Sequence, residues 1–194
     1  MVAPRPFRSL ALGLFLALPL ALLSGCGGGN AACEGEACAC EGEAGETCTC
    51  SEGTCSMACE QRDCSLTCRG DACDLQTAGA KGTLQCFGDC SGQLGEGGAL
   101  QCEGLSQCTV STGKGGDAVC RTDSRCDVSA LEGTKLRCED RAVCTLRCEK
   151  GCTMDCGGST VCTLRCTGGD CTMNCPASSK ITCPDGRVVC GGAC

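Results

Sequence analysis

Short segments in which every second residue is apolar recur along this chain. In CTLRC, from Cys144 to Cys148, positions one, three and five are Cys, Leu and Cys, whereas positions two and four are Thr and Arg. The segments CSMAC, CSLTC, CTMDC and CTMNC follow the same alternation, and CTVS and CDVS follow it more weakly. A period of two is typical of a strand with one buried face. The pattern predicts many short strands, and the chain after residue 32 shows no helical periodicity.

These segments repeat about every 18 residues. Cysteines that bound them follow one another at steps of 16 to 19 residues, as in Cys102, Cys120, Cys138 and Cys156. Turn residues such as Thr167–Asp170 separate the segments, so each period holds two strands and two turns. Repeats this short are typical of stacked solenoids. We therefore expect an all-β fold, a disulfide-rich two-sheet β-solenoid with about 18 residues per rung and about nine rungs.

Cysteine takes the place that large apolar residues hold in most protein cores. The chain has 29 cysteines among 194 residues, three phenylalanines, and no tryptophan, tyrosine or histidine. Phe7 and Phe15 lie in the first 25 residues, so Phe87 is the one aromatic residue of the remaining chain. Because aromatic side chains supply much of the apolar burial in ordinary cores, this composition indicates a scaffold held by disulfide bonds.

The first 26 residues have the features of an export signal. Arg5 and Arg8 precede an apolar stretch at 10–23 that is too short for a comfortable membrane span and is typical of a secretory signal. The stretch ends in the letters LSGC, of which the last is Cys26. Here the chain resembles bacterial lipoprotein precursors, whose lipobox is a small apolar tetrapeptide that ends in cysteine.

The resemblance implies how the chain is processed and where it resides. In that family the signal, here residues 1–25, is removed, and the cysteine, here Cys26, receives acyl chains of the palmitate type on its thiol and its new amino group. Residues 26–32 would then be the lipidated cysteine with a glycine-rich tether, and 33–194 the cysteine-rich repeat domain. Gly27 in place of aspartate implies sorting to the outer membrane of the envelope.

Export to an oxidising compartment favours disulfides over free thiols. Without Cys26 the chain holds 28 cysteines, an even number that allows 14 disulfides. Pairing them in sequence order closes a short turn with each bond. The pairs expected from this scheme include Cys68–Cys73, Cys86–Cys90, Cys102–Cys108, Cys120–Cys126, Cys138–Cys144, Cys148–Cys152, Cys156–Cys162 and Cys166–Cys171.

A second pairing, in which equivalent cysteines of adjacent rungs are bonded, remains open. Cys120–Cys138 is an example, because neighbouring strands lie about 4.8 Å apart, within the Cα range that disulfides accept. The turns TAGAKG, GEGGAL, TGKGGD and LEGT favour turn closure, since each lacks both cysteines rather than one. A ladder between rungs would not require that joint loss.

Thiolate metal binding is the alternative function that the cysteines suggest. The spacing Cys-x-x-Cys, typical of zinc and iron–sulfur sites, does not occur in this sequence, and Cys-x-Cys occurs at Cys38/Cys40 and Cys48/Cys50. The segment TGKGGDAVC resembles one repeat of calcium-binding β-rolls, whose sites need matching consecutive turns. We therefore expect no cofactor and no resident metal.

Charge and the missing histidine argue against several other functions. The formal net charge of −7 becomes −9 once Arg5 and Arg8 leave with the signal, so nucleic acid and anionic lipid are repelled. Without histidine the chain has no Ser/His or Cys/His nucleophile. The carboxylate pair Glu139 and Asp140 is expected in a solvent-facing turn, and the tripeptide RGD at 69–71 in another exposed turn.

The sequence thus predicts a protein that is not an enzyme: a lipid-anchored, disulfide-stapled rod of the cell envelope with a structural or adhesive role. Its expected partners are the membrane, through the lipid on Cys26, and an envelope component of unknown identity, with no nucleic acid. An extracytoplasmic thiolate metal-binding protein is the alternative, and an inhibitor or effector displayed on the turns is a third possibility.

Overall fold

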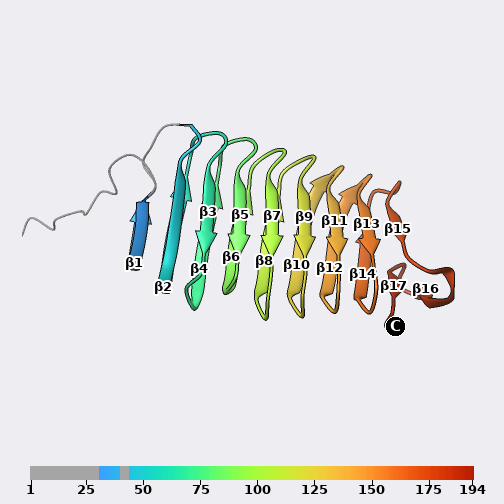
Figure 1. The fold of residues 1–194 in the computed structure, drawn as a ribbon. Coiled ribbons are helices and arrows are strands. Elements are labelled where there is room, and N and C mark those ends of the chain that lie inside the picture. Colours follow the sequence, from blue (N-terminus) through green and yellow to red (C-terminus); the bar gives the residue numbers. More distant parts are fainter. Residues whose placement is uncertain (1–30, 40–43) are drawn as a thin grey trace, which may run out of the picture.

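The computed structural model describes residues 31–39 and 44–194, and this part of the chain is almost entirely β-structure (Figure 1). The expected signal at 1–25, the expected lipidation site Cys26 and residues 27–30 of the expected tether lie outside the described residues. Ala31 and Ala32 open the first strand.

Seventeen strands and one short 3-10 helix follow one another along the described chain. Their bounds are β1 Ala31–Ala39, β2 Thr47–Cys59, β3 Ser65–Cys68, β4 Ala72–Thr77, β5 Thr83–Cys86, β6 Asp89–Leu94, β7 Ala99–Cys102, β8 Gln107–Thr112, β9 Asp117–Cys120, β10 Arg125–Glu132, β11 Lys135–Cys138, β12 Val143–Lys150, β13 Thr153–Cys156, β14 Val161–Cys166, β15 Thr172–Asn174, η1 Ala177–Ser179, β16 Lys180–Thr182 and β17 Val188–Cys190.

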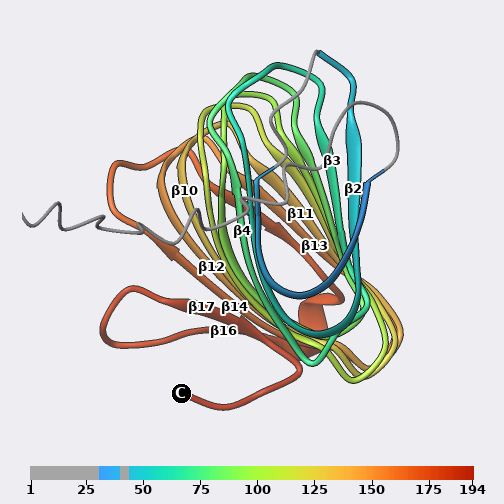
Figure 2. The ribbon, with the colours of Figure 1, turned by 90° about the vertical axis from the view of Figure 1, so that its left-hand side faces the viewer.

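The strands wind into a β-solenoid with two parallel faces, which confirms the expected fold class (Figure 1). The first sheet contains the start of β2 and then β3, β5, β7, β9, β11, β13 and β15; the second sheet contains the end of β2 and then β4, β6, β8, β10, β12 and β14. Figure 2 looks along the stack, where successive turns follow nested outlines. The repeat is in register, so equivalent residues of successive rungs lie side by side.

A narrow core of aliphatic residues and cysteines fills the space between the sheets. In the first sheet, fully buried residues at one register position form a column: Leu66, Leu84, Leu100, Ala118, Leu136 and Met154. The alternation in the sequence predicts inward side chains at Leu146, Leu164 and Met173 as well, and all three are buried. Apolar residues thus occupy the inner face of each strand, and no aromatic ring takes part in the buried core of the described chain.

Disulfides close the turns that lead from the first sheet to the second, called here the first edge. The bonds on this edge are Cys50–Cys55, Cys68–Cys73, Cys86–Cys90, Cys102–Cys108, Cys120–Cys126, Cys138–Cys144 and Cys156–Cys162. Each joins cysteines only four to six residues apart. The structure therefore contains turn-closing bonds along this edge rather than bonds between rungs.

The opposite turns, called here the second edge, have disulfides only toward the two ends of the described stack. The bonds there are Cys59–Cys64, Cys148–Cys152 and Cys166–Cys171. Between them the equivalent positions hold Thr77 and Gly82, Leu94 and Gly98, Thr112 and Gly116, and Ala130 and Thr134. In three of these four pairs, the first residue packs against a glycine. The side chain of that first residue fills the space that a disulfide occupies in the other turns. In these three turns the complementarity accounts for the absence of both cysteines.

The C-terminal end departs from the expected repeat. The expectation of about nine rungs is wrong, because the part of the chain that the structure describes forms a solenoid of about seven turns. After β15 the chain forms η1 and a hairpin of β16 and β17, and β17 runs antiparallel to β14 instead of adding a parallel rung. Sequence-order pairing also fails here, since the bonds are Cys175–Cys190 and Cys183–Cys194. The hairpin covers the last strand of the second sheet, as a cap that protects the end of a repeat protein does.

Candidate binding face of the second sheet

The outer face of the second sheet carries two rows of side chains in register, and all of them except Ala58 are polar. The central row is Ser56, Asp74, Ser91, Thr109, Asp127, Thr145 and Thr163. The lateral row, two residues further along each strand, is Ala58, Gln76, Gln93, Ser111, Ser129, Arg147 and Arg165. Because parallel strands repeat about every 4.8 Å, each row presents regularly spaced hydrogen-bonding groups along the solenoid.

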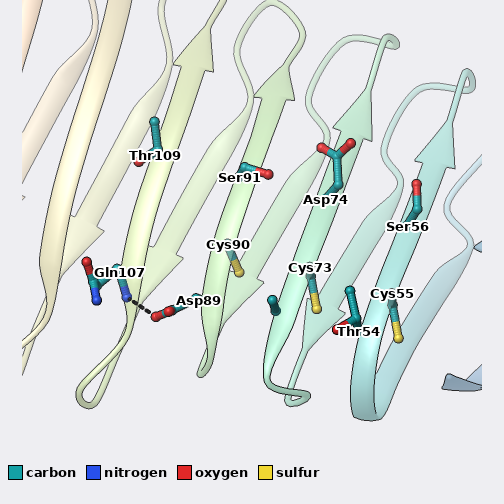
Figure 3. Close-up of a pocket in the computed structure, with 11 residues that line it drawn as sticks. Thr54, Cys55, Ser56, Cys73, Asp74, Asp89, Cys90, Ser91, Gln107 and Thr109 are labelled. Atoms are coloured by element: carbon teal, nitrogen blue, oxygen red, sulfur yellow. Dashed lines mark hydrogen bonds between the residues drawn. The ribbon is translucent and has the colours of Figure 1, made fainter. Parts of the chain in front are cut away.

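Three shallow hollows lie on this face. The first, of about 570 Å³, extends over β2, β4, β6 and β8 and is lined by Ser56, Asp74, Asp89 and Ser91 among others (Figure 3). Figure 3 shows Ser56, Asp74, Ser91 and Thr109 on four neighbouring strands. Asp89 Oδ1 accepts a hydrogen bond of 3.0 Å from the Gln107 backbone N–H and helps to fix the rim of the hollow.

The other two hollows continue the first toward the C-terminal end. One of about 430 Å³ shares Asp74, Ser91 and Thr109 with the first hollow and reaches Arg147. Another of about 440 Å³ shares Ser111, Ser129 and Arg147 with the second and extends past Arg165. The shared residues join these hollows into one continuous surface that follows the axis of the rod.

The charge of this face changes along the rod. Asp74 and Asp89 are exposed in the first hollow, whereas Arg147 and Arg165 are register partners on β12 and β14. Arg147 forms an ion pair with Asp127 of the preceding rung. An elongated ligand lying along the face would thus meet carboxylates first and guanidinium groups later.

Ion pairs between successive rungs line the first edge. Arg121 Nε lies 2.9 Å from Glu139 Oε2, and Arg121 Nη1 lies 3.8 Å from Glu103 Oε1. Arg141 Nε donates to Asp123 Oδ1 at 2.7 Å, and this hydrogen bond lowers the pKa of Asp123. Exposed pairs of this kind add little stability each, but opposite charges on adjacent rungs favour the correct register.

The candidate catalytic and adhesion motifs fall into structural roles. Glu139 binds Arg121, and its neighbour Asp140 is exposed to solvent, as expected for a turn. In the tripeptide at 69–71, the guanidinium of Arg69 lies 4.5 Å from the centre of the Phe87 ring. Gly70 is buried, and a side chain there would meet the carbonyl oxygen of Gly53.

The calcium-roll resemblance also falls on an ordinary turn. Gly115 has a positive φ of 69° that suits glycine, and Asp117 lies on the outer face of the first sheet. Asp117 Oδ1 lies 3.8 Å from Arg137 Nη2, so its carboxylate already faces a cation of the next rung.

The cysteines between residues 44 and 194 carry no thiolate. Every cysteine between residues 44 and 194 is disulfide-bonded. Cys102, Cys108 and Cys126 bring their three sulfur atoms within 4.8 Å of one another, but all three atoms belong to disulfides. A metal ion would need these bonds to be reduced first, because the thiolate is the ligand form of cysteine.

The sequence predicts solvent-facing rows but does not single out the residues that form the hollows. A signal for the central row exists: Ser, Thr or Asp stands between the two inward residues of each second-sheet segment, as in CSM, CDL, CTV and CDV. The alternation of apolar and polar residues does not indicate where hollows form on the surface of the sheet.

Within the described residues, no helix has the length and apolar character needed to cross a membrane. Comparisons with protein-family models, with curated proteins and with solved structures found no match to this chain. Its function must therefore be argued from its own residues.

Proposed function

We propose that this chain is a non-catalytic, lipid-anchored protein of the bacterial envelope with a structural or adhesive role. It would be a disulfide-stabilised rod that binds its partner through the outer face of the second sheet. The observation that carries the proposal is the continuous surface that the three hollows form over β2 to β14. A face that repeats its groups at a constant spacing fits an extended or repetitive envelope component, since solenoids use such surfaces for binding.

The disulfides support the location outside the cytoplasm. Bonds that close nearly every turn of the first edge form and persist in oxidising compartments. The lipobox ending at Cys26 supports anchoring at the N-terminal end, with the outer membrane as the destination that Gly27 implies. About seven rungs give a rod of roughly 30–35 Å. Because the proposed anchor is at the N-terminal end, the capped C-terminal end would point away from the membrane.

Anchoring is tested by Cys26→Ser in the full precursor. We expect the variant to leave the membrane fraction and to keep an unprocessed signal, because the thiol that accepts the lipid is missing. Cell fractionation and the intact mass of the purified chain measure both effects. A variant that stays in the membrane with the wild-type mature mass would refute the lipid anchor.

The binding face is tested by the pair of substitutions Ser91→Arg and Thr109→Arg, which place bulk and positive charge in the central row. We expect at least about a tenfold loss of partner captured from cross-linked envelopes, equivalent to about 1.4 kcal/mol. Gln101→Arg, at an exposed position of the first sheet, is the matched control and should leave capture unchanged. Equal capture by the wild-type protein, the double variant and the control variant would exclude the second sheet as the binding face.

A further inference from the structure

Two neighbouring disulfides of the first edge bring three sulfur atoms together. Cys102 and Cys108 form one bond, and Cys126 belongs to the bond of the next rung, with Cys120. The Sγ atoms of Cys102, Cys108 and Cys126 all lie within 4.8 Å of one another. All four cysteines are at most 1% exposed, so the sulfur of one disulfide faces the next disulfide rather than solvent.

We propose that these residues form an internal thiol–disulfide exchange site with Cys126 as the nucleophile. When the turn between Cys120 and Cys126 opens transiently, an external thiol of the small monothiol class bonds to Cys120, which is fully buried in the closed turn, and leaves Cys126 as a thiolate. The Cys126 thiolate attacks Cys108, the Cys108–Cys126 bond forms, and the Cys102–Cys108 bond breaks. Cys102 leaves as a thiolate and takes up a proton, so the number of disulfides in this internal step is unchanged.

The product bond fits the geometry of the sheet. Cys108 and Cys126 are register partners on β8 and β10. Parallel neighbours are about 4.8 Å apart, within the Cα range of disulfides. Turn closure and rung-to-rung bonding are therefore two states that one exchange step connects.

The exchange has a direction along the rod, because it moves the free thiol from Cys126 to Cys102, one rung closer to the N-terminal end. Cys102, Cys120, Cys138 and Cys156 are register partners in succession, and the first three are fully buried whereas Cys156 is half-buried. In the described chain the sulfur cluster joins only these two rungs, so the thiol should stop at Cys102 and not reach Cys138 or Cys156.

The test uses Cys120→Ser in the full chain, purified in its oxidised, lipidated form. This variant leaves Cys126 as a thiol without any added reductant. After incubation at pH 8, alkylation and non-reducing peptide mapping should find a Cys108–Cys126 bond and an alkylated Cys102. Exchange should slow by about tenfold for each unit of pH below the thiol pKa, because the thiolate is the attacking form.

Cys152→Ser is the matched control on the second edge. It frees Cys148, whose register partner Cys166 is bonded to Cys171. In the described part of the chain these sulfur atoms form no cluster like that of Cys126, so the thiol should stay on Cys148. Exchange at equal rates in both variants would overturn a site specific to Cys126.

A folding defect in Cys120→Ser is handled with the wild-type chain. A substoichiometric amount of a monothiol, followed by the same mapping, should give the Cys108–Cys126 bond while the far-ultraviolet circular dichroism stays native. If the only free thiol is on Cys126, with the monothiol bonded to Cys120, in a protein that stays folded, the proposal is wrong.

Discussion

Full reduction of the disulfides should convert the rod into a disordered, protease-sensitive chain. Each turn-closing bond spans four to six residues and contributes about 2 kcal/mol in the loop-entropy model, at the low end of the range for disulfides. Ten such bonds lie between Cys50 and Cys171, so even half of their combined effect rivals the 5–15 kcal/mol that a domain typically has in total.

The core cannot replace these bonds. Its largest fully buried side chains are leucine and methionine, and the sheets around them are thin. Ordering each residue costs about 1–2 kcal/mol of backbone entropy, and this chain has 30 glycines, whose cost is the highest. Aliphatic columns such as that of Leu100 and Leu136 therefore direct the fold without being sufficient for it.

Far-ultraviolet circular dichroism and limited proteolysis of the reduced, alkylated chain measure the outcome. We expect loss of the strand signal and rapid cleavage throughout the solenoid. The double substitution Cys138→Ser with Cys144→Ser is the graded control, which should destabilise by about 2 kcal/mol and leave the fold intact. A fully reduced chain that stays protease-resistant would mean that cysteine serves here as a small core residue.

The alternation and the cysteine spacing are sufficient to predict most of the solenoid. Leu146 is buried between Cys144 and Cys148 because period two puts all three on one face of β12. The joint absence of cysteines from the middle turns points to turn closure, and Cys138–Cys144 closes its turn. Both inferences rest on local geometry, which repeats in each rung.

The cap was not predicted because its cysteines continue the spacing of the repeat. Cys175 and Cys194 follow Cys156 at steps of 19 residues, so they resemble further rungs. A hairpin signal is nevertheless present, since Asp185 and Gly186, which favour a tight turn, stand between the β-branched residues of β16 and β17. Gly186 has a positive φ of 81°, as a tight turn requires.

The hollows of the second sheet were not predictable for a different reason. The alternation identifies which residues face outward, but the shape of the surface depends on how neighbouring rungs pack. Gly92 illustrates this: the pattern places it among Leu75 and Val110 as an inward position where an aliphatic residue would be expected. The structure instead packs the backbone of the preceding strand against it.

Gly92→Ala should therefore destabilise the rod, although the sequence pattern suggests that a larger residue would improve the core. A Cβ at position 92 would lie 2.1 Å from the carbonyl oxygen of Leu75. That oxygen belongs to the backbone of β4, which is paired with β2 on its other side and cannot easily move away. The strand spacing must widen locally, and overpacking of this kind costs about 1–3 kcal/mol.

Thermal unfolding of the oxidised protein, or denaturant unfolding where heating is irreversible, measures the effect. Each kcal/mol should lower Tm by about 2–4 °C for a chain of this size. Gly157→Ala is the matched control, because its Cβ would lie 3.7 Å from the Cys138 carbonyl oxygen, an ordinary contact. Both alanines restrict the unfolded chain equally, so the difference between the two variants isolates the clash in the sheet. A Gly92→Ala protein as stable as Gly157→Ala would mean that β4 and β6 lie further apart than in this structure.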